Sequence, residues 1–185
     1  ELAIAAGLPA GVFNVVPGLG AEAGQALARH MDVAKIAFTG SGPTGRKMMQ
    51  YAAESNMKQV SLELGGKSPQ VVLNDCTDLE AAASTIAWAI YYNAGQTCNA
   101  GSRIIVEKGV KEDLFAHLHK FLESFVVGNQ FDPTTQMAGL VSELQRDRVN
   151  AYLDLVGQDG EKLIFGGEKT TGKDLLIKPT LIDNV

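Results

Sequence analysis

The sequence predicts an α/β fold built from mostly parallel sheets covered by helices. Two observations support this prediction. Short apolar runs rich in β-branched residues alternate with amphipathic stretches of helical length along the 185 residues. Short glycine-containing turns separate the runs, as they do between strands and helices. The composition, with 45% apolar and 20% charged residues, is ordinary for a globular protein.

The first third of the chain opens on the tail of an amphipathic helix, residues 1–6, which Gly7 ends. Ala23, Leu27 and Met31 then form one apolar stripe of a helix. The elements expected after the opening helix are a strand at 12–16, a helix at 20–31, a strand at 33–38, a helix at 44–54, and strands at 60–64 and 70–73.

The rest of the chain begins with Asp78, a favourable N-cap for a long helix at 79–93. Apolar residues run nearly all round this helix, so we expect it to be buried, with Trp88, Tyr91 and Tyr92 in the core. The remaining expected elements are a strand at 102–106, helices at 111–126 and 143–157, a strand at 162–165 and a strand at 175–181 that carries Pro179.

Charge and cysteine content exclude several classes of protein. The net charge of −5, without a dense Lys/Arg cluster, argues against a nucleic-acid or anionic-membrane surface. No apolar run is long enough to span a bilayer. Cys76 and Cys98 are too few for a disulfide framework, which favours a reducing, cytoplasmic compartment. Because the chain starts without Met and stops just after a strand-like run, we expect it to be part of a longer protein.

The stretch KIAFTGSGPTGRK, residues 35–47, places a glycine turn between an expected strand and an expected helix. A P-loop needs Lys directly after its last glycine and then Ser or Thr, but Arg46 follows Gly45 and no hydroxyl follows Lys47. The spacing does fit the dinucleotide fingerprint G-x-G-x-x-G, with Glu63 as the acidic residue for a ribose. A tight turn without a ligand remains an alternative.

Cys98 lies just past Gly95, where the helix at 79–93 should have ended. A thiol in a loop among small residues can face a cleft as a nucleophile, although a free cysteine is more often a buried apolar residue. Cys76 lies among acidic residues, which disfavour a thiolate. His117 and His119 are two residues apart on one helix and face different sides, so no metal site is expected.

Four motifs in order resemble the NAD(P)-dependent aldehyde dehydrogenase superfamily: FNVVPGLG (13–20), IAFTGSGPTG (36–45), SLELGGKSP (61–69) and NAGQTCNAGSR (93–103). The last two are most similar to the branch that acts on amino-aldehydes, such as the gamma-glutamyl-gamma-aminobutyraldehyde type. The resemblance implies the C-terminal part of a Rossmann-like coenzyme-binding domain at 1–64 and the N-terminal part of a catalytic α/β domain at 65–185.

This resemblance also implies a mechanism. Cys98 matches the family nucleophile, whose thiolate forms a thiohemiacetal and then a thioester. Glu63 matches the general base that activates the hydrolytic water, which replaces its assignment to a ribose. The implied cofactor is NAD, with NADP possible. The residues implied to bind it are Gly18, Gly20, Gly40, Ser41, Gly45, Leu64 and Gly65.

The implied partner is a small aldehyde, with a homo-oligomer in the full-length protein. Family segments that supply an oxyanion donor and hold both riboses do not occur in the chain, so we expect the 185 residues alone to be weakly active or inactive. Two alternatives remain open. One is a CoA-acylating aldehyde dehydrogenase that uses the same Cys98, and the other is a non-catalytic binding domain of the same fold.

Overall fold

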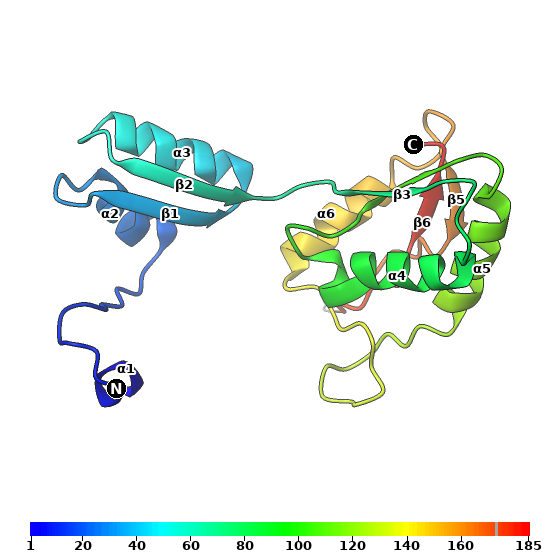
Figure 1. Ribbon diagram of the computed structural model, residues 1–185, viewed down its shortest axis with the longest axis horizontal. Coiled ribbons are helices and arrows are strands. Elements are labelled where there is room, and N and C mark those ends of the chain that lie inside the picture. The colour runs from blue at the N-terminus through cyan, green and yellow to red at the C-terminus, as the bar shows by residue number, and fades with distance from the viewer. Residues whose placement is uncertain (173) are drawn as a thin grey trace. The chain divides into compact units, whose positions relative to one another are not determined.

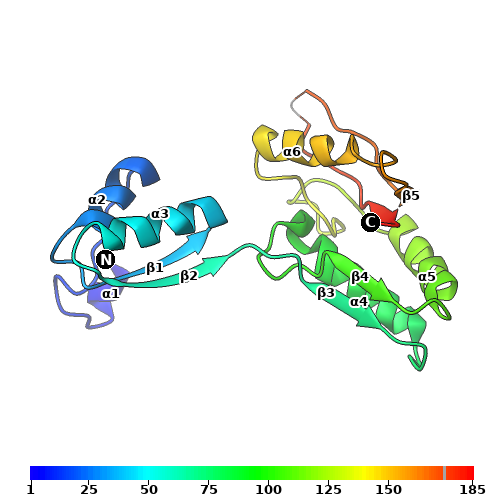
Figure 2. The same cartoon turned by 90° about the horizontal axis from the view of Figure 1, so that it is seen from above.

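The computed structural model describes residues 1–172 and 174–185, which fold into two compact units, Glu1–Gly65 and Gly66–Val185 (Figures 1 and 2). Each unit contains a parallel strand pair and helices, so the predicted α/β class is confirmed. The units divide at the glycine pair, one residue from the predicted boundary. The assignment of the units to coenzyme-binding and catalytic domains stays a prediction.

The first unit is a strand–helix–strand arrangement. Its elements are α1 (Leu2–Ala5), the π-helical turn η1 (Gly20–Gly24), α2 (Gln25–Arg29), β1 (Lys35–Gly40), α3 (Gly42–Ala53) and β2 (Gln59–Leu64). β1 and β2 pair in parallel, in register from Lys35↔Gln59 to Gly40↔Leu64, and α3 connects them. α3 forms because Pro43 is tolerated in its first turn and its buried residues, Gly45, Met48 and Ala52, recur on one face.

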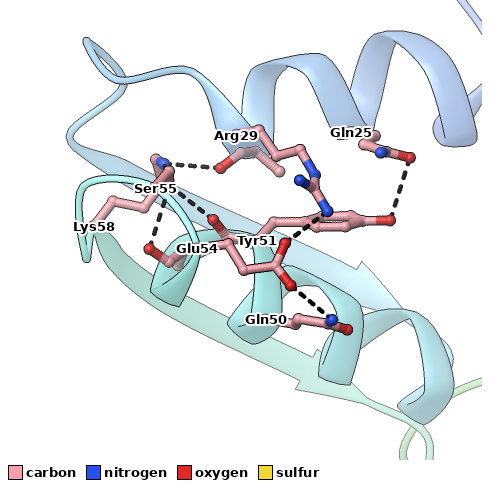
Figure 3. Close-up of polar contacts among 9 residues, drawn as sticks. Gln25, Arg29, Gln50, Tyr51, Glu54, Ser55 and Lys58 are labelled. Carbon is pink, nitrogen blue, oxygen red and sulfur yellow. Dashed lines mark hydrogen bonds and ion pairs between the residues drawn. The ribbon is translucent and has the colours of Figure 1, made fainter.

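A polar network ties α2 to α3 (Figure 3). The Lys58 ammonium is buried, and it donates to the Ala28 carbonyl at 2.8 Å and to Ser55 Oγ at 2.6 Å. It thus places a positive charge at the C-terminus of α2, where the helix dipole favours one. Arg29 pairs with Glu54 at 2.6 Å.

The second unit contains two strand pairs and three α-helices. Its elements are β3 (Pro69–Val72), α4 (Leu79–Tyr91), the short turn η2 (Tyr92–Gly95), β4 (Arg103–Val106), α5 (Lys111–Glu123), α6 (Glu143–Leu153), β5 (Lys162–Phe165) and β6 (Leu181–Asp183). β3 and β4 pair in parallel, whereas β5 and β6 pair antiparallel.

The core of the second unit lies between α4 and α5, which run side by side (Figure 2). Leu114, Leu118 and Leu122 recur every four residues on the buried stripe of α5 and join Ile86 and Ala87 of α4 in one cluster. The predicted cap of α4 is confirmed, because the Ala81 N–H donates to Asp78 Oδ1 at 2.9 Å.

Two predicted strands are wrong. Residues 12–16 form no strand, and Val12, Phe13, Val15 and Val16 are 62–73% exposed, because no neighbouring strand pairs with them. Of residues 175–181, only Leu181 enters a strand, β6. Pro179 cannot donate to a ladder, which is consistent with pairing that starts after it.

The helix at 79–93 was predicted to be buried all round, and this is wrong. Tyr91 is buried and donates to the Thr180 carbonyl at 3.0 Å, but Trp88 and Tyr92 are exposed. The core covers one side of α4 only. Other helices are shorter than predicted: 20–31 divides into η1 and α2, 111–126 ends at Glu123 and 143–157 ends at Leu153.

Candidate active site

The carboxyl edge of the β1–β2 pair brings several predicted site residues together. Gly40 lies opposite Leu64 in the parallel register, and Thr39 lies opposite Glu63. Ser41 alone links β1 to α3, and Gly65 follows β2 directly. This edge, where strands end and a helix begins, is where α/β sheets commonly bind ligands.

The three fingerprint glycines have different environments. A Cβ on Gly45 would lie 2.9 Å from Leu64 Cδ2, so this glycine allows α3 to pack closely on β2. A Cβ on Gly40 would meet the Phe38 ring at 2.6 Å, whereas one on Gly42 would have open space. Because Ser41 is the whole connection between β1 and α3, there is no room for the longer phosphate loop of a P-loop protein.

The N-terminus of α3 is open to an anion. Ser41 is its N-cap, yet the Ser41 side chain makes no capping bond to the helix backbone. Its hydroxyl instead lies 3.0 Å from Thr44 Oγ1. A helix N-terminus that its own N-cap side chain leaves unsatisfied, with open space at Gly42, suits a phosphate group.

Two further glycines are predicted to bind the cofactor, and both are exposed. Gly18 lies two residues before η1, and Gly20 is its first residue. A Cβ on Gly18 would lie 2.8 Å from Ala23 Cβ, so Gly18 permits a tight approach of the chain to η1. A Cβ on Gly20 would meet nothing within 4 Å. Steric need thus explains Gly18 but not Gly20.

Cys98 is exposed and lies in a turn after α4, so the alternative of a buried apolar cysteine is wrong. The chain reaches this turn through three consecutive residues with left-handed backbone, Asn93, Ala94 and Gly95, at φ of 51°, 54° and 73°. The Ala100 N–H donates to the Thr97 carbonyl at 3.3 Å and closes the turn around the thiol. Cys76 is half-buried, and its Sγ lies 3.7 Å from the Asp78 carbonyl.

Neighbouring segments fix the far side of the Cys98 turn. The Gly101 N–H donates to the Ala89 carbonyl at 3.1 Å, and Gln70 Nε2 donates to the Gly101 carbonyl at 2.7 Å. A Cβ on Gly66 would lie 3.4 Å from the Cys98 carbonyl oxygen. The second glycine of the Gly65–Gly66 pair therefore runs directly beside the cysteine.

A shallow surface hollow of about 540 Å³ borders the same turn on the exposed side of α4. Thr97 and Asn99, the two neighbours of Cys98, line it together with Trp88 and Tyr92. The sequence analysis placed these two aromatic residues in the core. Their positions in the sequence, ten and six residues before Cys98, could have indicated that they lie near the cysteine, since both belong to the segment that leads into the turn.

Among residues 1–172 and 174–185, no group of three or more His, Cys, Asp or Glu side chains is arranged to hold a metal ion. Over the same described ranges, every helix is too short or too polar to cross a bilayer. Cys98 belongs to the second unit and Glu63 to the first.

The second unit exposes the Cys98 turn, and the first unit has an open strand–helix edge. Comparison with known proteins identifies the family. The family model described as the aldehyde dehydrogenase family matches residues 1–185. The chain belongs to the aldehyde dehydrogenase family, which confirms the resemblance in its sequence.

Among curated relatives, the aminoacetaldehyde dehydrogenase of Pseudomonas aeruginosa is 45% identical over 185 residues, which are 100% of this chain and 37% of that protein. The NADP/NAD-dependent aldehyde dehydrogenase PuuC of Escherichia coli is 43% identical over 184 residues, again 100% and 37%. The chain therefore spans little more than a third of the length of these relatives.

Solved structures agree. A gamma-glutamyl-gamma-aminobutyraldehyde dehydrogenase from Burkholderia cenocepacia superposes with a TM-score of 0.91 at 46% identity, over 98% of this chain and 37% of that one. An indole-3-acetaldehyde dehydrogenase complexed with NAD+ gives 0.94 at 44% identity, over 100% and 38%.

Proposed function

We propose that the protein containing this chain oxidises an aldehyde to a carboxylic acid and passes hydride to NAD or NADP. The observation that carries the proposal is the exposed Cys98 turn in a member of the aldehyde dehydrogenase family. An accessible thiol in the turn between α4 and β4 can reach a small carbonyl compound. A thiol sealed in the core could not.

In the proposed reaction, the Cys98 thiolate attacks the carbonyl carbon and forms a thiohemiacetal. As the thiohemiacetal oxyanion reforms its C=O bond, the carbon gives up a hydride, for which a nicotinamide held at the carboxyl edge of β1–β2 would be the acceptor, and a thioester remains on Cys98. Glu63 takes a proton from water, and the resulting hydroxide attacks the thioester carbon. The carboxylic acid then leaves and the thiol is free again.

Glu63 can serve as this base because of its place in the chain. It is exposed near the carboxyl end of β2, and no side-chain hydrogen bond engages it among the described contacts. Gly66, which packs beside the Cys98 carbonyl, follows it by only three residues. Three residues of extended chain span about 10 Å at most, so this connection is short enough for Glu63 to serve Cys98 in the proposed reaction.

The cofactor proposal rests on the carboxyl edge of β1–β2. The open N-terminus of α3, with Ser41 and Gly40, would hold the pyrophosphate, and the Leu64 and Gly65 backbone would meet the nicotinamide. Gly18 and Gly20 would allow the adenine end to approach. Gly45 acts by letting α3 rest on β2, because its α-carbon faces Leu64.

The substrate, assembly and compartment are proposed from relatives. Names such as aminoacetaldehyde and gamma-glutamyl-gamma-aminobutyraldehyde dehydrogenase favour a small amino-aldehyde. A homo-oligomer of the full-length protein and a cytoplasmic location are also proposed, although one 45% identical relative, from Leishmania tarentolae, is named mitochondrial.

A chimera tests the proposal. Residues 1–185 replace the matching part of the Pseudomonas aeruginosa relative, and NADH formation from aminoacetaldehyde is followed with and without CoA. We expect CoA-independent turnover that Cys98→Ala abolishes and Cys76→Ala spares. Glu63→Gln should keep one burst of NADH per site but slow the steady state by about 10²–10⁴-fold.

Other outcomes decide between the alternatives. Turnover that requires CoA would identify the acylating enzyme. A folded chimera with no burst, in which iodoacetamide labels Cys98 no faster than Cys76, would identify a non-catalytic domain. The 185-residue chain alone should turn over at least about 10²-fold more slowly than the chimera, as expected when oxyanion donors are missing.

A further inference from the structure

The backbone that leads to Cys98 is in an unfavourable conformation. Asn93 and Ala94 have positive φ, which places a Cβ too close to the following carbonyl oxygen. Glycine avoids this penalty at position 95 and asparagine reduces it at position 93, so it falls mainly on Ala94. Such a conformation persists only where surrounding contacts hold it. The question is which contacts hold this one.

The Gln96 carboxamide makes the required contacts. Its Nε2 donates to the Asn93 carbonyl at 3.0 Å, beside the Gln96 backbone N–H, which donates to the same carbonyl at 3.1 Å, and both bonds close the left-handed turn. Its Oε1 accepts the Val141 N–H at 2.9 Å, across 45 positions of sequence. In return, Asn93 Nδ2 donates to the Gln96 carbonyl at 3.3 Å. Both polar ends of the Gln96 side chain are therefore used.

The Val141 end of this contact is itself fixed. Ser142, the next residue, caps α6, and its Oγ accepts the Gln145 N–H at 3.2 Å. Within residues 92–99, the described side-chain hydrogen bonds to residues outside the turn come from Gln96 alone. The near side of the Cys98 turn is therefore attached to the start of α6 through one amide.

We infer that Gln96 is a positioning residue for Cys98, because it holds the left-handed turn at residues 93–95 against the start of α6. Gln96 touches neither substrate nor cofactor in this role. The inference rests on the proposed function only for its effect on turnover. The geometric part concerns the second unit alone and can be measured without catalysis.

The test compares three variants of the 185-residue chain: Gln96→Met, Gln96→Glu and Gln158→Met. All of them carry Cys76→Ser, so that iodoacetamide can alkylate no cysteine other than Cys98. Methionine preserves length but removes both hydrogen bonds, whereas glutamate can still accept from Val141 but cannot donate to Asn93 when ionised. Gln158 is an exposed glutamine of the same unit, so it serves as the matched control. The readouts are the Val141 amide exchange rate, the ¹⁵N order parameter of Cys98 and its rate of alkylation by iodoacetamide.

For Gln96→Met we expect Val141 exchange to rise threefold or more. The Cys98 order parameter should fall from about 0.85 to below about 0.6, the range of mobile backbone. Its alkylation rate should change at least threefold. Gln96→Glu should keep the Val141 protection and an intermediate Cys98 order parameter, and Gln158→Met should change nothing. If the Gln96→Met variant does not fold, the Cys98 order parameter and alkylation rate of Gln96→Glu alone test the positioning role.

Unchanged Val141 exchange in Gln96→Met would overturn the contact. Faster Val141 exchange with an unaltered Cys98 order parameter and alkylation rate would overturn the positioning role. In the chimera, Gln96→Met should lower kcat at least tenfold and leave KM within twofold. A chimera that never oxidises aldehyde, while the chain shows the expected Cys98 response, would refute the proposed function and leave this inference standing.

Discussion

Gly45 and Leu64 approach so closely that a Cβ at position 45 would lie 2.9 Å from Leu64 Cδ2. The glycine is buried on the face of α3 that packs on β2. A position that pattern alone assigns to phosphate binding is thus fixed by helix–strand packing. The same contact fixes how the first turn of α3 lies over the carboxyl edge of β2, where Ser41 and Leu64 are proposed to meet the cofactor.

Gly45→Ala should destabilise the first unit by about 1–3 kcal/mol, because the added methyl overpacks the α3–β2 contact. Gly42→Ala is the matched control on the same helix and should be neutral or stabilise by up to about 1 kcal/mol, since its Cβ would meet open space. Hydrogen exchange of the β2 amides, followed as a function of urea concentration, measures the free energy of unfolding of the first unit in both variants. Equal effects of the two substitutions would contradict this packing role.

Lys58→Met should lower the free energy of unfolding of the first unit by about 1.5–3 kcal/mol, the range for hydrogen bonds to a charged group. The loss follows because the buried ammonium holds the Ala28 carbonyl and Ser55 Oγ. Lys47→Met, on the exposed face of α3, should change stability by no more than about 0.5 kcal/mol. Urea unfolding followed by hydrogen exchange over residues 25–60 distinguishes them, and a Lys58→Met effect as small as the control would refute the prediction.

Gly101→Ala should disturb the Cys98 turn, because its Cβ would lie 2.6 Å from the Gln70 carboxamide. We expect a cost of about 1–3 kcal/mol and a changed alkylation rate of Cys98. Gln70→Ala removes the obstructing amide, so the double variant should cost less than the two single variants together. Strict additivity in a double-mutant cycle would show that the two residues do not clash.

Asp183 gives a pH-dependent prediction. The hydrogen bond from Lys111, at 2.6 Å, lowers the pKa of the Asp183 carboxyl. A group with a lowered folded-state pKa stabilises the fold above its unfolded pKa of about 3.9, and this stabilisation is lost as the pH falls through the folded value. Asp183→Asn should therefore cost up to about 1 kcal/mol at pH 7 and little near pH 2.

Urea unfolding at several pH values between 2 and 7 checks this expectation. The matched control is Glu112→Gln, which removes an exposed carboxylate from the first turn of α5, the helix that carries Lys111. A cost of Asp183→Asn that stays constant over the whole pH range would show that the ion pair contributes nothing.

Local signals predicted most of the fold. The Asp78 cap, the leucine stripe of α5 and the strand at Lys162–Phe165 all follow from short-range pattern. The strand predicted at 12–16 failed because β-propensity reflects packing against a neighbouring strand, and none lies there. The exposed face of α4 likewise depends on what packs against it, which its own apolar content does not reveal.

For the candidate site too, the sequence indicates some features, whereas others depend on contacts between distant residues. The exposure of Cys98 agrees with its position among small loop residues. A loop-shaping role of Gln96 is suggested by its place two residues before Cys98, but its partner is not, because Val141 lies 45 positions away and a backbone N–H leaves no trace in the sequence. The contact between Gly45 and Leu64 could not be predicted either, since a pattern of glycines does not show whether a missing Cβ makes room for a ligand or for a leucine.

The attachments of the cysteine turn have a consequence for biosynthesis. Val141 lies 43 residues after Cys98, so the ribosome must add that stretch before Gln96 Oε1 can accept the hydrogen bond from the Val141 N–H. At about 5–20 residues per second, the nascent chain carries an unsecured thiol for several seconds. The geometry of the Cys98 turn should therefore be completed only after residue 141 has been synthesised.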